Sequence, residues 1–202
     1  MRRRPVVFDA LAWWGRLHGY RSLLPIAVPW VLLMLIFGGV EVLEIGPIRL
    51  AASAPIAVML TFGGGFIVNY CVWLNTNVPI SNPVRYAAAR VAAVTGVLAC
   101  ACLVTVLGVL LRDSDPAASV RNLVFAFCAF YWTQRMAPSI YWLIPVTYLL
   151  VTMYFGMGQY DFMPWALPLV SGDSIPHLVF TGLLLILTLA GIAGKVPVTG
   201  AA

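Results

Sequence analysis

Charged residues are scarce in this chain, where Asp, Glu, Lys and Arg together make up only 9% of the 202 residues. Ordinary soluble domains carry roughly 25% charged residues. Hydrophobic residues make up 62% of the sequence, and a soluble fold of this length has too little interior to bury them. The composition therefore excludes a soluble domain and indicates a protein that is surrounded mostly by lipid.

The sequence also lacks the motifs on which common enzyme chemistry depends. It contains no P-loop, no glycine-rich dinucleotide motif and no His-Glu-x-x-His zinc motif. Ser174 and His177 are close in sequence, but a nucleophile and base also need an orienting group and an oxyanion site. We interpret His177 as a polar residue at a helix end. The chain is expected not to be an enzyme and to require no cofactor.

Cysteine is absent from the segments between the apolar stretches, where an oxidising compartment would pair it. All four cysteines lie inside apolar stretches, with no His or acidic residue near them in sequence: Cys71, Cys100, Cys102 and Cys128. Small buried apolar residues are their simplest interpretation, and we predict no metal site.

Six long apolar stretches are present, at about residues 22–43, 50–74, 86–111, 117–134, 139–157 and 175–194. A transmembrane helix needs about 20 residues that are mostly apolar. We therefore predict an all-α, polytopic membrane protein with six transmembrane helices in a single domain, 1–202. The fourth stretch is the weakest, because only 13 uncharged residues separate Arg121 from Arg135. Its crossing requires the Arg121 side chain to extend toward the outer surface.

The charges that remain alternate in sign along the chain. Nine of the twelve Lys and Arg residues fall in alternate segments between the stretches, and six of the seven acidic residues fall in the others. Short segments rich in Lys and Arg stay cytoplasmic, which predicts a cell-membrane protein with both termini in the cytoplasm. The basic segments would also attract anionic lipid. No contiguous basic groove is present, so no nucleic-acid partner is expected.

Two segments are apolar in part without being long enough to cross. Residues 6–20 predict an amphipathic helix in the membrane interface, preceding the first span, with Arg16 on its flank. Its interfacial anchors are Trp13, Trp14, Leu17 and Tyr20. Residues 162–172 are apolar but short and carry two prolines, which is typical of a re-entrant or interfacial segment.

The second stretch contains a glycine triplet, Gly63, Gly64 and Gly65, followed by Asn69. Small residues allow neighbouring helices to approach closely, or allow a helix to bend at a hinge. An unwound ligand site on a transport pathway is the alternative interpretation. Both remain open from the residues alone.

The segment before the third stretch is polar and is expected on the cytoplasmic side. Asn82 followed by Pro83 predicts a helix start, and Arg85 and Arg90 follow on that helix. Together with Arg16 and Arg21 near the first span, this segment is suited to docking a cytoplasmic protein.

This layout resembles that of the permease subunits of type-2 ABC exporters. Those subunits have six spans, cytoplasmic termini, an interfacial helix before the first span, a cytoplasmic coupling segment between spans two and three, and re-entrant helices before the last span. The resemblance implies an interfacial helix at 6–20, a coupling segment at 75–90 and outer helices at 162–172. Within the coupling segment, Ser81-Asn82-Pro83-Val84-Arg85-Tyr86 resembles the family's approach to span three.

The function implied by the resemblance is export of a small or amphipathic solute. The chain would pair with a second permease copy or homologue, and a separate cytoplasmic nucleotide-binding ATPase would supply the energy.

Three other hypotheses remain. The first is an accessory or assembly subunit of a larger membrane complex. The second is the substrate-capturing subunit of an energy-coupling-factor vitamin importer, which is similar in size and span number. Such subunits typically contact their partner through small residues at positions i and i+4 of the first span. No Ala-x-x-x-Ala pattern of this kind occurs here between Ser22 and Leu43. The third is a membrane enzyme, which the lack of a catalytic constellation disfavours.

Overall fold

The structure, a computed structural model, describes residues 24–37, 53–73, 83–110, 115–156 and 165–194. These residues form six α-helices and one short 3₁₀-helix, with no β-strand among them, which confirms the all-α prediction. Several predicted features lie outside the described residues: the interfacial helix at 6–20 with Trp13, Trp14, Leu17 and Tyr20, and the polar residues Arg16, Arg21 and Asn82.

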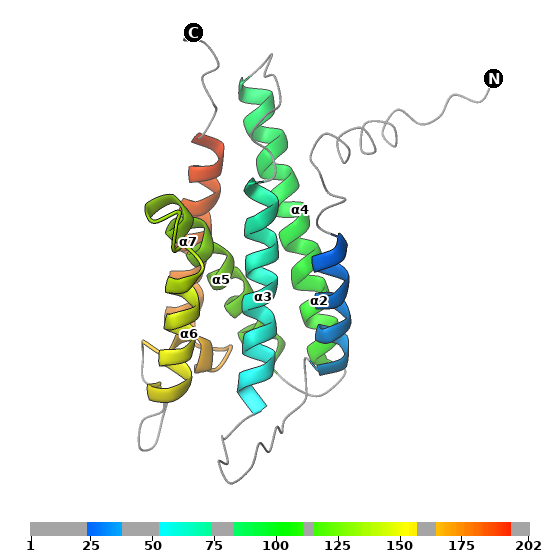
Figure 1. The fold of residues 1–202 in the computed structure, drawn as a ribbon, viewed down its shortest axis with the longest axis vertical. Coiled ribbons are helices and arrows are strands. Elements are labelled where there is room, and N and C mark those ends of the chain that lie inside the picture. Colours follow the sequence, from blue (N-terminus) through cyan, green and yellow to red (C-terminus); the bar gives the residue numbers. More distant parts are fainter. Residues whose placement is uncertain (1–23, 38–52, 74–82, 111–114, 157–164, 195–202) are drawn as a thin grey trace, which may run out of the picture.

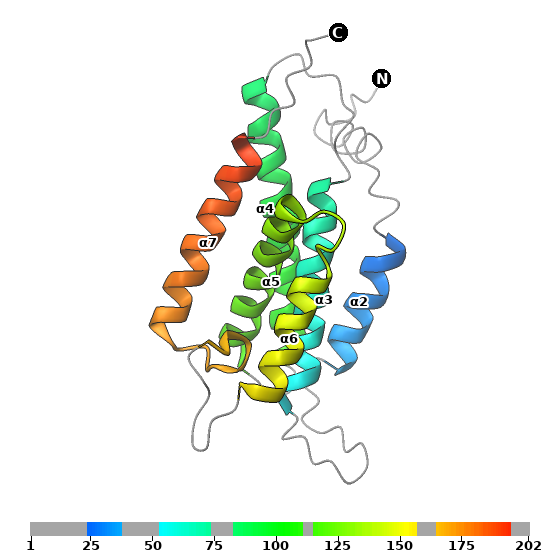
Figure 2. The same ribbon diagram turned by 60° about the vertical axis from the view of Figure 1, so that its left-hand side comes forward.

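Consecutive α-helices run in opposite directions along a single bundle (Figure 1). They are α2 (Leu24–Phe37), α3 (Ser53–Trp73), α4 (Pro83–Leu110), α5 (Pro116–Met136), α6 (Leu143–Phe155) and α7 (Ile175–Gly194), with the 3₁₀-helix η2 (Leu167–Leu169) before α7. Helix α5 is central, because it packs against α3, α4, α6, α7 and η2. Helix α2 packs on α3 and α4 at the edge of the bundle (Figures 1 and 2).

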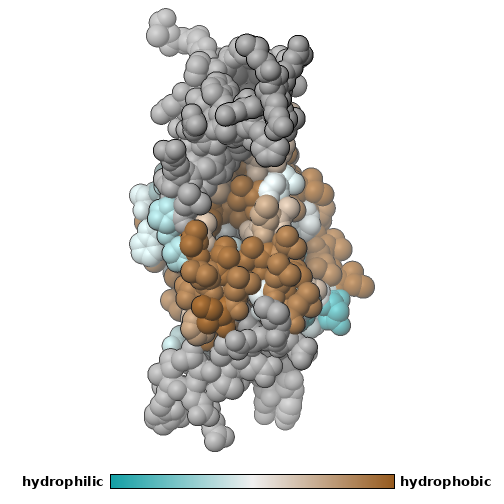
Figure 3. Space-filling model, turned by 90° about the vertical axis from the view of Figure 1, so that its right-hand side faces the viewer, coloured by the Kyte–Doolittle hydropathy of each residue, from teal (hydrophilic) through white to brown (hydrophobic). Residues whose placement is uncertain are grey.

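Three segments are long and apolar enough to cross a membrane: Ile56–Trp73, Ala87–Leu110 and Ile175–Gly194. The apolar parts of α2 and α6 are shorter, and α5 carries Arg121 and Arg135 within its 21 residues. Large apolar side chains cover the outward faces, and on the α2 side they dominate the middle of the molecule (Figure 3). A surface of this kind is compatible with a membrane protein.

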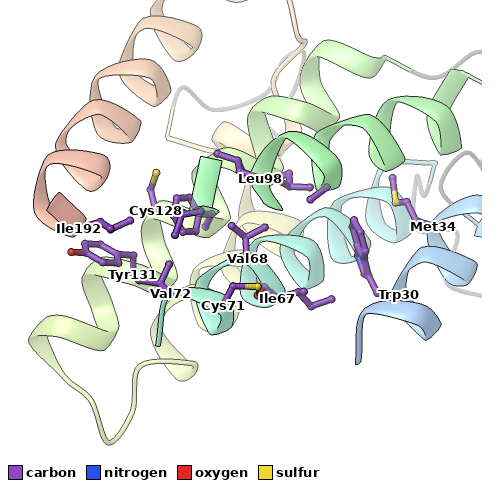
Figure 4. Close-up of a cluster of buried hydrophobic side chains, with 14 of the residues drawn as sticks. Trp30, Met34, Ile67, Val68, Cys71, Val72, Leu98, Cys128, Tyr131 and Ile192 are labelled. Carbon is purple, nitrogen blue, oxygen red and sulfur yellow. Dashed lines mark hydrogen bonds between the residues drawn. The ribbon is translucent and has the colours of Figure 1, made fainter. Parts of the chain in front are cut away.

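The main core joins α3 and α5 to the helices on either side of them. Val68 on α3 and Leu123 and Phe127 on α5 are completely buried. Trp30 of α2 and Ile192 of α7 extend this cluster to both sides of the bundle (Figure 4). Trp30 is also fixed by a hydrogen bond, because its indole N–H donates to the Leu60 carbonyl over 2.6 Å.

The glycine triplet lies within α3, which is helical without interruption from Ser53 to Trp73. A Cβ atom on Gly64 would lie 2.5 Å from Cζ2 of Trp30, and one on Gly65 would lie 2.6 Å from the main-chain nitrogen of Phe127. At Gly63 the added atom would make only an ordinary contact with Trp30. The uninterrupted helix and these short distances favour the close-packing interpretation over an unwound ligand site.

We predict that Gly65→Ala destabilises the protein and that Gly96→Ala does not. The methyl group at position 65 would force the backbones of α3 and α5 apart, and overpacking of this kind costs about 1–3 kcal/mol. Gly96 of α4 has no neighbour within 4 Å of an added Cβ, so it is a matched helical control. Thermal unfolding in detergent measures both variants. Equal unfolding midpoints would show that α3 and α5 are not in such close contact.

Candidate functional site at the cap segment

A buried arginine connects the beginning of α5 to a segment that precedes α7. The Arg121 side chain is only 2% exposed. Its guanidinium donates to the carbonyl oxygens of Leu167 at 2.8 Å, Val170 at 2.5 Å and Ser171 at 2.7 Å, and to Oδ1 of Asn122 at 3.3 Å. A buried charge is costly unless hydrogen bonds compensate it. We call residues 165–172 the cap segment, because they lie across the beginning of α5 at one end of the bundle (Figure 2).

Asp115 and Asn122 hold the same segment at two further points. Asp115 is the N-cap of α5 and accepts hydrogen bonds from the N–H groups of Ala117 and Ala118. Its other carboxylate oxygen accepts from the Gly172 N–H at 2.7 Å. The Asn122 amide donates to the Pro168 carbonyl at 2.8 Å. One carboxylate therefore caps α5 and fastens the end of the cap segment.

Glycine is required at position 172 by this close approach. A Cβ atom there would lie 2.4 Å from the main-chain nitrogen of Ala118 and 2.6 Å from the Asp115 carboxylate. No side chain fits between the cap segment and the first turn of α5.

The prediction that Arg121 extends toward the outer surface did not include the burial of its side chain. The side chain is buried because the cap segment folds over the beginning of α5 and offers its carbonyl oxygens as acceptors. Those carbonyls would otherwise be poorly satisfied, since η2 is only three residues long. The charge and the carbonyls thus compensate each other.

A cavity of about 440 Å³ lies beside the cap segment, between α6 and α7 and over α5. This volume falls in the range of roughly 300–1,000 Å³ that is usual for small-molecule sites. The lining residues are Phe125 of α5, Tyr148 of α6, Trp165 and Leu167 of the cap segment, and Pro176, His177 and Phe180 of α7. The Tyr148 hydroxyl donates to the Trp165 carbonyl at 2.8 Å, so its polar atom is directed to the cap segment.

Ser174 and His177 meet at the rim of this cavity, with Oγ and Nδ1 2.6 Å apart. Helix α7 begins at Ile175, so Ser174 stands at its N-cap position and His177 at its third residue. The two residues are one helical turn apart, so their side chains bond to each other at the beginning of α7. No group of three His, Cys, Asp or Glu residues suited to a metal ion occurs in the described part of the chain.

Asn69, Pro83, Arg85 and Arg90, which belong to the predicted site residues, lie toward the opposite end of the bundle. Asn69 of α3 is buried, and its amide donates to Oε1 of Gln134 at 2.7 Å. Helix α4 begins at Pro83, with Arg85 in its first turn. Arg90 lies further along α4 and donates to the Val72 carbonyl, in the last turn of α3, at 3.0 Å. The structure thus places Asn69 and Arg90 near the same end of α3, far from the cap segment (Figure 1).

The residues that hold the cap segment were not predicted from the sequence as a site, and only one of them carries a local signal. Asp115 before Pro116 is a typical N-cap followed by a proline at the first helical position. Nothing local connects Arg121 with its acceptors, which lie 46 to 50 residues further along the chain.

No family model, no curated protein and no solved structure matches this chain. The function must therefore be inferred from the geometry of the site.

We predict that Arg121→Met releases the cap segment. The change leaves the carbonyls of Leu167, Val170 and Ser171 without their donor, and disrupting a buried charged network costs about 3–5 kcal/mol. Hydrogen–deuterium exchange of peptides covering residues 165–172 should become faster. Arg135→Met, at the other end of α5, is the control and should leave this exchange unchanged. Equal exchange in the two variants would contradict the assigned role of Arg121.

We predict that acid weakens the cap segment through Asp115. Burial opposes ionisation, but hydrogen bonds from the N–H groups of Ala118, Gly172 and Ala117 and the charge of Arg121 outweigh it. They hold the pKa of Asp115 below its ordinary value. Because the folded pKa is depressed, the stabilisation is complete above the unfolded pKa of about 3.9 and is lost as pH falls through the folded pKa.

The measurement is the unfolding midpoint against pH for the wild type and for Asp115→Asn. The wild type should be more stable at neutral pH, and the difference should narrow below about pH 4, where the unperturbed carboxyl titrates. A difference that stays constant through the acidic range would show that Asp115 does not act through its charge.

Proposed function

We propose that this chain is a six-span membrane protein acting as the permease subunit of an ABC-type exporter. A separate cytoplasmic ATPase would drive it to move a small or amphipathic solute. The cavity beside the cap segment is the observation that carries the proposal, because an apolar hollow between membrane helices is suited to such a solute.

The six-span architecture is supported by the alignment of the helices along one bundle axis. Helices α3, α4 and α7 contain the segments that meet the length and hydropathy of a span, and α2, α5 and α6 run alongside them in alternating directions (Figure 1). The two arginines of α5 lie near its ends, and both donate to main-chain carbonyls. Helix α5 would therefore cross with both guanidinium groups hydrogen-bonded to main-chain carbonyls.

The orientation follows from the alternating charges. The beginning of α4 and the end of α5, which carry Arg85, Arg90 and Arg135, lie at the same end of the bundle (Figure 1). By the preference of Lys and Arg for cytoplasmic segments, this end faces the cytoplasm and the cap segment faces outward. Both termini are then cytoplasmic.

The cytoplasmic end has a contact that would transmit a partner's movement to two helices together. Arg90 of α4 donates to the Val72 carbonyl in the last turn of α3. An ATPase pressing on the segment between these helices would displace both of them. The contacts proposed for the partner are Arg16, Arg21, Asn82, Pro83, Arg85 and Arg90. The chain itself has no phosphate-binding motif, so ATP hydrolysis is assigned to the partner.

The proposal predicts that a P-loop ATPase co-purifies with the protein and that Arg85→Glu weakens this association. Reversing a charge in a basic docking segment introduces repulsion, and about a tenfold loss of affinity corresponds to 1.4 kcal/mol. Arg112→Glu is the matched control, because its segment is predicted to lie outside. Quantitative mass spectrometry of the purified complexes measures the ATPase.

Two results would overturn this proposal. One is the absence of any P-loop ATPase from the purified protein, and the other is full retention of the ATPase by Arg85→Glu. Loss of other membrane subunits when the chain is deleted, without loss of an exported solute, would instead identify an accessory or assembly subunit.

A further inference from the structure

We infer that the cavity beside the cap segment takes up the hydrocarbon chain of a membrane amphiphile, which enters from the lipid phase between α6 and α7. As the substrate class of an exporter, this inference rests on the proposed function. The binding site itself rests on the contacts described below.

The chemistry of the walls favours hydrocarbon over a polar solute. Phe125, Leu167, Pro176 and Phe180 offer only carbon atoms. The Tyr148 hydroxyl already donates to the Trp165 carbonyl. A buried water needs two to four polar partners, and this wall provides few. A flexible apolar chain is therefore the favoured occupant, because it has no hydrogen bonds to lose on entering the cavity.

The position of the opening indicates where such a chain comes from. Helices α6 and α7 both pack on α5 and flank the cavity (Figure 2). Both helices carry exposed apolar side chains, such as Leu150 and Val151 of α6 and Val179 and Leu183 of α7. In a bilayer these faces contact acyl chains, so the opening meets hydrocarbon and not water.

The depth of the cavity suits an amphiphile instead of a wholly apolar molecule. It extends from Pro176 to Phe180, which is the first turn and a half of α7 and about 8 Å at 1.5 Å per residue. The rim next to it is polar, with Ser171 donating to Asp173 and Ser174 paired with His177. A head group would lie at this rim while its chain occupies the cavity.

A transmembrane helix of a partner is too large for the same space. A helix with its side chains is about 10–12 Å across, whereas the cavity is about 440 Å³ and is closed on one side by α5 and on another by the cap segment. A single extended chain fits these limits.

Photolabelling of the full chain in nanodiscs tests the inference. The probe is a phosphatidylcholine that carries a diazirine in the half of one acyl chain next to the head group, because a cavity about 8 Å deep receives only that part of the chain. Label is expected on Leu167, which is only 4% exposed, and on Phe125 of the cavity floor. Chains that merely surround the protein would label outward residues such as Val179 and Leu183.

A matched pair of variants identifies the route of entry. Phe180→Asn places an amide among the residues that line the cavity, whereas Val179→Asn makes the same change at a residue of similar exposure that does not line it. Labelling of Leu167 should fall by at least about fivefold in the first variant and stay at the wild-type level in the second. Label confined to outward residues, or equal losses in both variants, would overturn the inference.

The test separates this inference from the proposed function, because it uses the purified chain without any ATPase. If Leu167 is labelled but no ATPase co-purifies, the lipid site is supported and the exporter proposal is refuted. Unlabelled Leu167 with an ATPase bound would refute only the lipid site.

Discussion

The compensation of the Arg121 charge by main-chain carbonyls is the interaction on which the candidate site depends. A guanidinium has five N–H donors in a fixed plane, so one side chain can satisfy several acceptors together. Here it binds carbonyls on both sides of a turn that η2 alone could not hold. The cap segment is therefore fixed over α5, and the cavity exists because Trp165 and Leu167 are held at its edge.

The same chemistry recurs at the opposite end of the bundle. Arg90 donates to the Val72 carbonyl in the last turn of α3, and Arg135 donates to the Gly191 carbonyl in the last turn of α7. The final carbonyls of a helix have no partner within the helix, and lipid supplies none. These arginines thus satisfy the ends of neighbouring helices in addition to setting the charge of their side of the membrane. Since Arg90 has this structural role, Arg85 is the cleaner position for probing a partner.

Local signals in the sequence predicted the helices well. The start of α4 follows from Pro83 and that of α7 from the apolar run that begins at Ile175, because caps and apolar length act over a few residues. Contacts between distant segments could not be predicted from the sequence. Asn69 and Gln134 are 65 residues apart, and no pattern links them. The glycine triplet shows both cases. Its small residues were evident in the sequence, but the choice between close packing and a ligand site required knowing that Trp30 and Phe127 lie against it.

The packing of α3 on α5 limits how the cavity can open. Gly65 meets the α5 backbone so closely that the two helices cannot approach further, and the buried cluster around Val68 and Phe127 holds them together. Close-packed interiors transmit displacement as rigid units instead of deforming. A movement of α3 and α4 at the Arg90 contact would therefore carry α5 with it. The cavity can then widen between α6 and α7, while Arg121 either moves with the cap segment or releases it.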